Sequence, residues 1–357
     1  MEARVVIGER ADAVAANNRN DWPGVVLAPG AGGAGGLQVT QVIQGSPAYI
    51  IGLRNGDIVT SVNGREINNL PLFFRVLREG TANDLRLTFT RGTGAVAAAG
   101  GSHTLAVRSD GTLWAWGDHS HGRTGFGIVS GHISTPSRVD TATNWASVSA
   151  GRSHTVGIRS DGTLWTWGYN GNGKLGDGTT ATIRPSPGQI QPGMIWVSAS
   201  AGRDHTVAVR SDGTLWAWGN NGHGRLGDGT GTHRRTPVRI GMATNWVSVA
   251  AGEAHTVAIR ADGSLWAWGR NSYGQLGDGT RTDRNAPVRV GTATDWASAT
   301  AGSTHTVAVR TDGTFLSWGN SRRGKLGGGT TTTVTIPTFG GTNDIVFRNA
   351  PATIVLQ

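Results

Sequence analysis

The sequence predicts a mainly β protein in which a small α+β domain is followed by a five-repeat β-propeller. The main observation is a His-Thr pair that recurs with successive spacings of 51, 51, 50 and 50 residues. The five pairs begin at His103, His154, His205, His255 and His305. A period of this size is typical of propeller blades or solenoid turns. The first 95 residues lack the pattern, which predicts a separate domain.

Each repeat contains two short runs of β-branched, aromatic and apolar residues around an Asp-Gly dipeptide. In the third copy, HTVAVR and TLWAWG flank Asp212-Gly213, a pair that permits the positive φ of a tight hairpin turn. Trp216 and Trp218 are two residues apart on a strand and therefore point to one face. The second tryptophan of the run recurs at Trp116, Trp167, Trp218, Trp268 and Trp318. We expect these side chains to pack against the adjacent blade rather than to bind a ligand.

The domains that we expect are a lead-in segment of residues 1–21, a small domain of residues 22–95, and the repeats of residues 96–357. In the small domain, apolar runs alternate with turn signals such as Asn63-Gly64, which predict hairpins. NNLPLFFRVLREG predicts an amphipathic helix that begins at Asn68 or Asn69 and ends before Gly80. LRLTFTR alternates strictly and predicts a half-buried last strand.

The composition excludes several classes of protein. The chain has no cysteine, which excludes disulfides, thiol catalysis and cysteine-based zinc sites. No apolar run approaches the length of a membrane span, and no signal peptide is visible, so we expect a soluble chain. The net charge of +9 favours acidic partners, but the arginines are scattered along the repeats. Nucleic acid is therefore not the expected partner.

Residues 22–92 contain the segment GSPAYIIGLRNGDIVTSVNG, which resembles the PDZ domains of Do-like (HtrA, DegP-like) serine proteases. The resemblance implies a groove in which a peptide C-terminus adds to a sheet edge. The implied binding residues are Pro23, Gly24, Val25 and Val26 in a carboxylate-binding loop, and Leu72, Phe73 and Val76 on the helix. Pro23 has no N–H group to donate, and the helix residues would equally suit packing against other apolar surface. The resemblance implies a periplasmic or secreted protein, and the alternative is a cytoplasmic one.

The repeats, written out in full for one copy as AGRDHTVAVRSDGTLWAWG with GRLGDG, resemble those of the regulator-of-chromosome-condensation (RCC1-like) family. The resemblance implies a β-propeller with four strands per blade. The first copy has Gly94 where the others have a tryptophan, and the fifth has FLSWG for LWAWG; atypical end repeats are typical of capped arrays. Five repeats predict either a closed five-bladed ring, fastened by the final strand IVFRNAPATIVLQ, or a partial propeller.

No motif predicts an enzyme. The first 95 residues contain no histidine and no GNSGG motif, so a protease triad is excluded there, and no metal or nucleotide motif calls for a cofactor. Histidines that occur once per blade do not converge on one ion, so we expect them to form hydrogen bonds between strands or blades. An arginine and an aspartate, Arg210 and Asp212 in the third copy, recur at each Asp-Gly turn. They predict a charged docking rim or, in the favoured interpretation, local solvation of the turns.

The expected function is a non-enzymatic scaffold that binds peptide C-termini through its PDZ-like domain and a protein partner through its propeller. One alternative is a regulatory or substrate-presenting fragment of an HtrA-type protease system. Another is a regulator of GTPases that resembles a guanine-nucleotide exchange factor. Specificity is expected where the copies differ, in the loops of residues 118–134, 180–194 and 231–235. The sequence does not predict the oligomeric state.

Overall fold

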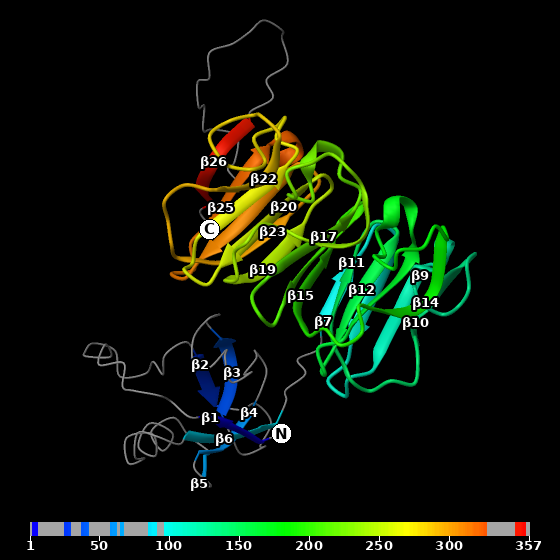
Figure 1. Ribbon diagram of the computed structural model, residues 1–357. Coiled ribbons are helices and arrows are strands. Elements are labelled where there is room, and N and C mark those ends of the chain that lie inside the picture. The colour runs from blue at the N-terminus through cyan, green and yellow to red at the C-terminus, as the bar shows by residue number, and fades with distance from the viewer. Residues whose placement is uncertain are drawn as a thin grey trace, which may run out of the picture. The chain divides into compact units, whose positions relative to one another are not determined.

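The computed structural model describes residues 2–5, 25–29, 37–42, 58–62, 65–67, 85–90, 96–326 and 347–354. The chain forms two compact units, Met1–Ala95 and Val96–Gln357 (Figure 1). No helix among the described residues is long and apolar enough to cross a membrane.

The first unit contains one antiparallel sheet. Its strands are β1 (Glu2–Val5), β2 (Val25–Pro29), β3 (Leu37–Val42), β4 (Ile58–Val62), β5 (Arg65–Glu66) and β6 (Leu85–Thr90). They pair in the order β1-β6-β4-β3-β2, and β5 pairs with β4. Val59 and Val62 of β4 are buried, as is Ile67. The helix expected near residues 68–80 lies outside the described residues.

The second unit consists of five four-stranded antiparallel sheets, which confirms the five-bladed β-propeller (Figure 1). Blade 1 contains β7 (Val96–Ala99), β8 (His103–Val107), β9 (Leu113–Asp118) and β10 (His132–Arg138). Blade 2 contains β11 (Trp145–Ala150), β12 (His154–Arg159), β13 (Leu164–Tyr169) and β14 (Ile183–Ile190). Blade 3 contains β15 (Trp196–Ala201), β16 (His205–Arg210), β17 (Leu215–Gly219) and β18 (Arg234–Arg239). Blade 4 contains β19 (Trp246–Ala251), β20 (His255–Arg260), β21 (Leu265–Gly269) and β22 (Arg284–Arg289). Blade 5 contains β23 (Trp296–Ala301), β24 (His305–Arg310), β25 (Phe315–Asn320) and β26 (Phe347–Ile354).

Each blade follows directly from the repeat. The His-Thr run forms the second strand and the LWAWG run forms the third, and they pair in register with His205 opposite Gly219. The Asp-Gly turn between them has Gly213 at φ 75°, which glycine adopts without a steric penalty. Short 3-10 turns follow the third strand in four blades, at η1 (Ser120–Gly122), η2 (Gly171–Gly173), η3 (Gly222–Gly224) and η4 (Arg322–Gly324).

The final strand of the chain belongs to blade 5. β26 pairs with β25, with Phe315 opposite Ile354, so it completes the fifth blade and does not fasten that blade to the first. Successive blades contact one another through their first strands, from β7 through β11, β15 and β19 to β23. Among the described residues, no comparable contact joins β7 to β23.

Apolar packing holds neighbouring blades together. Trp218 of blade 3 is fully buried among Val156, Ile158 and Leu164 of blade 2, and the same arrangement recurs at the other joints. The tryptophan that opens each of blades 2–5 packs edge-to-face on the buried tryptophan of the third strand of the same blade. The ring centroids are 5.7–6.1 Å apart and the ring planes meet at 61–66°.

The repeated histidines form hydrogen bonds between blades. His205 Nε2 lies 3.0 Å from Thr256 Oγ1 of the next blade, and the Thr256 hydroxyl donates to the carbonyl oxygen of Arg225 at 2.8 Å. The equivalent His-Thr pairs are His103 with Thr155, His154 with Thr206, and His255 with Thr306. Each of these four histidines is buried. They therefore serve as structural links at the joints.

A glycine in the return loop makes room for the next blade's tryptophan. Gly227 has φ 82°, and a Cβ there would lie 2.6 Å from Trp268 Nε1. We expect Gly227→Ala to destabilise the propeller by about 2–4 kcal/mol, because it adds a steric clash to an unfavourable backbone conformation. Chemical denaturation of the full chain measures the change.

The matched control for this substitution is Gly229→Ala. Gly229 has a similar φ of 81°, but a Cβ there would meet nothing within 4 Å. We expect it to cost only the backbone strain, about 1 kcal/mol. Equal losses in the two variants would contradict the packing role of Gly227.

Candidate functional site

A polar cleft of about 620 Å³ lies at one end of blades 1–3. It is formed where the turns between the first and second strands meet the segments that follow the third strands. Its lining residues are Gly101, Ser102, Asp118, His121, Arg123, Arg152, Ser153, Tyr169, Arg203 and Asp204. Because the turns come from different copies of the repeat, side chains about 50 residues apart meet in one place.

Arg123 forms the wall of the cleft on blade 1. Its Nε donates to the Ser120 carbonyl oxygen at 2.8 Å, and its NH1 donates to the Arg152 carbonyl oxygen of blade 2 at 3.3 Å. Asp118 lies 3.5 Å from the same guanidinium. The Arg123 side chain is buried, so these contacts compensate its charge and fix its position.

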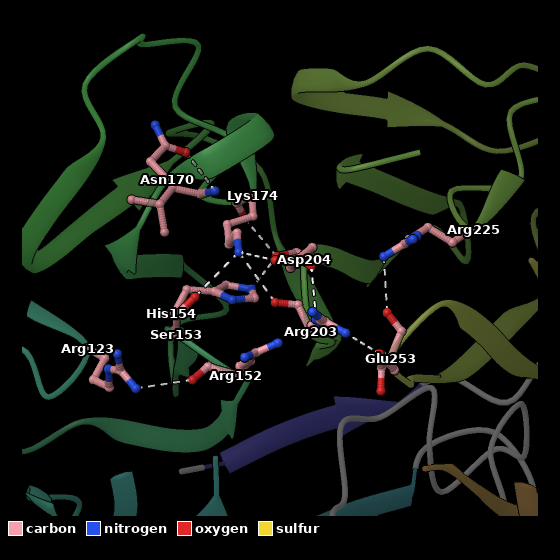
Figure 2. A network of polar contacts seen from close by, with 12 residues as sticks. Arg123, Arg152, Ser153, His154, Asn170, Lys174, Arg203, Asp204, Arg225 and Glu253 are labelled. Atoms are coloured by element: carbon pink, nitrogen blue, oxygen red, sulfur yellow. Dashed lines mark hydrogen bonds and ion pairs between the residues drawn. The ribbon is translucent and has the colours of Figure 1, made fainter. Parts of the chain in front are cut away.

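Lys174 occupies the equivalent position on blade 2 and is only 1 % exposed. Its Nζ donates to Asp204 Oδ1 at 2.5 Å and to Ser153 Oγ and the Arg203 carbonyl oxygen at 3.4 Å (Figure 2). Burial lowers the pKa of Lys174, and the Asp204 carboxylate opposes that shift. Lys174 therefore holds Asp204 at the edge of the cleft.

Arg203 and Glu253 continue this network onto blades 3 and 4. The Arg203 guanidinium pairs with the Glu253 carboxylate, and its Nε lies 3.4 Å from Asp204. Arg225 donates to the Glu253 carbonyl oxygen at 3.1 Å (Figure 2). The carboxylates of Asp204 and Glu253 are thus already engaged by cations of the propeller.

Arg152 differs from the other arginines of the cleft. Its side chain is exposed, and among the described residues no hydrogen bond or ion pair engages its guanidinium (Figure 2). It lies in the turn between β11 and β12, beside Ser153 and between the turns that carry Ser102 and Arg203. A guanidinium has five N–H donors. The cleft therefore has unused donors for an anion.

The structure also places the repeated arginines of the Asp-Gly turns, for which the sequence predicted a docking rim or, in the favoured interpretation, local solvation. The Arg210 guanidinium lies over the Trp216 ring at 3.7 Å and over Trp196 at 4.9 Å, and Arg159 and Arg260 stack on the equivalent tryptophan pairs. Asp212 accepts hydrogen bonds from the backbone N–H and hydroxyl of Thr214. The arginines thus form cation–π contacts within the blades, a role that the sequence analysis missed.

The remaining predicted site residues lie in both units of the chain. Trp167, Trp218, Trp268 and Trp318 are fully buried, whereas Trp116 on blade 1 is half-buried. Among the described residues, no group of three or more histidines and carboxylates could hold a metal ion. Val25 and Val26 begin β2, while Pro23, Gly24, Leu72, Phe73 and Val76 lie outside the described residues. The PDZ-like groove stays a prediction.

Sequence reasoning found only part of the cleft. Of the three loops expected to carry specificity, the loop of residues 118–134 contributes Asp118, His121 and Arg123, and the other two contribute no lining residue. Arg152 and Arg203 were missed. The sequence did contain a signal for these two arginines, because the residue that follows Ala-Gly differs between the copies. It is Gly101, Arg152, Arg203, Glu253 and Ser303 in turn.

Comparison with known proteins finds family models that match parts of both units of the chain. Residues 78–348 match the family model of the RCC1-like domain, and residues 38–91 match that of the PDZ domain. E3 ubiquitin-protein ligase HERC2 of Mus musculus is 33% identical over 136 residues, which are 37% of this chain and 3% of that protein. The mitochondrial RCC1 domain-containing protein RUG3 of Arabidopsis thaliana is 36% identical over 138 residues, which are 36% of this chain and 31% of that protein. The matches thus span less than a third of the length of these relatives.

Solved structures show the same fold. The crystal structure of human WBSCR16 has a TM-score of 0.61 and 22% identity, and the match covers 77% of this chain and 70% of that one. Yeast RCC1 (Prp20), in its complex with Kap60, has a TM-score of 0.55 and 20% identity, and the match covers 73% and 74% of the two chains. Since the family model matches well over half of its residues, this chain belongs to the RCC1-like domain family.

Proposed function

We propose that this chain is a non-enzymatic protein-binding scaffold whose propeller binds an acidic segment of a protein partner in the cleft of blades 1–3. The observation that carries the proposal is the exposed Arg152 guanidinium, which has no partner among the described residues. A carboxylate from outside would engage the donors that the propeller leaves unused.

The surroundings of Arg152 favour an acidic peptide over a neutral one. Asp118 is engaged by Arg123, and Asp204 by Lys174 and Arg203, so these carboxylates are already compensated. Ser102, Ser153 and Tyr169 add hydroxyl groups to the lining. A volume of about 620 Å³ is in the range of binding sites for small ligands and would hold a few residues of an extended segment.

The comparisons support a protein partner. Yeast RCC1, which shares the fold, was solved bound to the protein Kap60. Membership in the RCC1-like family also keeps the regulator of GTPases as an alternative, which nucleotide-release assays on small GTPases test. The match of residues 38–91 to the PDZ domain supports binding of peptide C-termini by the first unit, and a library of C-terminal peptides tests that part with the full chain. A role in an HtrA-type protease system is the remaining alternative.

The experiment measures the affinity of the full chain for a fluorescently labelled peptide of glutamate and glycine residues. We expect Arg152→Glu to weaken binding at least tenfold, or about 1.4 kcal/mol, because it replaces the unpaired cation by an anion. A peptide with glutamine in place of glutamate should not bind measurably.

The matched control is Arg235→Glu, which makes the same change of charge at an exposed arginine outside the cleft. It should lower the affinity much less than Arg152→Glu. Equal losses in the two variants would show that only the net charge of the chain attracts the peptide, and an unchanged affinity in Arg152→Glu would remove the cleft from the proposal.

A further inference from the structure

The first blade leaves one sheet face without a neighbouring blade among the described residues. Cross-strand pairing places six side chains on this face: Ala97, Ala99, Thr104, Ala106, Trp114 and Trp116. All six are exposed or half-buried. The equivalent Thr206, Ala208 and Trp218 of blade 3 are fully buried against blade 2. We call this surface the leading face.

On the fifth blade, the sheet face that points away from blade 4 is not covered by another blade among the described residues. Its strands place Ser298, Thr300, Val307, Val309, Phe315 and Ser317 together, and all of them except the buried Ser317 are exposed or half-buried. Phe315 is 36% exposed, whereas Leu265 at the same position of blade 4 is 0% exposed. Val257 and Ile259, the counterparts of Val307 and Val309, are also buried. We call this surface the trailing face.

The four internal joints show what covers such faces. At every joint the trailing face of one blade packs on the leading face of the next, with a His-Thr hydrogen bond and a backbone hydrogen bond beside the apolar core. At the first three joints a basic side chain also donates to a carbonyl oxygen of the next blade, and Gln275 takes its place at the fourth. In the joint of blades 3 and 4, His205 bonds to Thr256 and the Arg203 N–H donates to the Gly252 carbonyl oxygen at 3.2 Å. A basic side chain, Arg225, donates to the Glu253 carbonyl oxygen.

The two end faces retain the groups that make these contacts. The trailing face has His305, which is half-exposed, and the basic side chain of Lys325. The leading face has Thr104 and the carbonyl oxygen of Gly101, which are the counterparts of Thr256 and of the Glu253 carbonyl oxygen. The end faces are therefore complementary to each other in both apolar and polar groups.

We propose that the trailing face of one chain binds the leading face of a second copy of the same chain, and so forms a fifth joint between molecules. The contact is head-to-tail, because different surfaces of the two copies meet. It continues the interface that already joins blades 1 to 5. The central side chains of the two faces are uncharged in a chain of net charge +9, so the association should strengthen when salt screens repulsion between the copies.

The test measures the molar mass of the full chain by light scattering across a range of micromolar concentrations. We expect the wild type to associate, and Ala106→Arg on the leading face or Val307→Arg on the trailing face to weaken self-association at least tenfold. Phe315→Glu is a second trailing-face variant at a more exposed side chain, and circular dichroism checks that each variant folds. Met242→Arg, at a side chain that is 82% exposed, is the control and should associate like the wild type.

Mixing the two kinds of variant tests the head-to-tail geometry. Ala106→Arg keeps an intact trailing face and Val307→Arg keeps an intact leading face, so the mixture should form heterodimers and nothing larger. A wild-type chain that stays monomeric at all concentrations would overturn the proposal, as would closure of blade 5 onto blade 1 of the same chain. Association that survives both substitutions would place the contact elsewhere and would also overturn it.

Discussion

Acidification from pH 7 to about pH 5 is expected to lower the free energy of unfolding of the propeller by at least about 4 kcal/mol. The cause is the set of four buried histidines at the blade joints. Burial, with a smaller contribution from Arg123, lowers the pKa of His103 to about 4, and burial lowers the pKa of His255 to about 3. Burial also places the pKa of His154 and His205 well below 6.5.

The direction of the effect follows from the protons bound by each state. Below about pH 6.5 the unfolded chain protonates these histidines, while the folded chain keeps them neutral until the pH approaches their lowered pKa values. Stability is therefore complete above about pH 6.5 and falls as the pH decreases, by about 1.4 kcal/mol per pH unit and histidine. A loss of about 4 kcal/mol is a large fraction of the whole stability of an ordinary domain.

Denaturant unfolding at a series of pH values measures this slope. His255→Gln removes one of the titrating groups and should reduce the slope below pH 6 by about 1.4 kcal/mol per pH unit. His132→Gln, at an exposed histidine outside the joints, should leave the slope unchanged. A stability that is independent of pH between 7 and 5 would contradict the neutral, buried state of the joint histidines.

Trp218→Ala is expected to destabilise the propeller by about 3–5 kcal/mol. The side chain is 0% exposed and packs among residues of blade 2, so its removal leaves a cavity in the joint. Thermal or denaturant unfolding of the full chain measures the loss.

Trp116→Ala provides the matched comparison, because Trp116 occupies the same position of the repeat on the leading face and is half-buried. We expect it to cost less than half as much as Trp218→Ala. Equal costs for the two variants would show that the tryptophans stabilise their own blades rather than the joints.

The repeat predicted the fold because one pattern specifies each blade. The spacing of the His-Thr pairs, the Asp-Gly turn with Gly213 at φ 75° and the paired tryptophans all depend on local geometry that the sequence displays. The expectation that the joint histidines bond between blades also followed from their spacing. The His-Thr pair and the Asp-Gly turn occur in all five copies and the paired tryptophans in four, so several copies support each inference.

The cleft could be predicted only in part, because it is formed by residues that differ between copies. Arg152 and Arg203 meet in space through the stacking of blades, and their spacing alone does not tell which neighbouring charges they find. Arg203 pairs with Glu253 of the next blade, whereas Arg152 has no such carboxylate among the described residues. The stacking of Arg210 on Trp216 was missed for a related reason, since six residues separate the two positions and only the paired strands bring them together.

The most direct test of the proposed function locates the bound acidic peptide. A glutamate-rich peptide with a photoreactive group is cross-linked to the full chain, and the modified residues are identified by mass spectrometry. Cross-links are expected in the segments of residues 101–102, 118–123, 152–153, 169 and 203–204, and they should be lost in Arg152→Glu. Cross-links spread evenly over the exposed arginines of all five blades, or confined to positions away from blades 1–3, would contradict the assignment of the cleft.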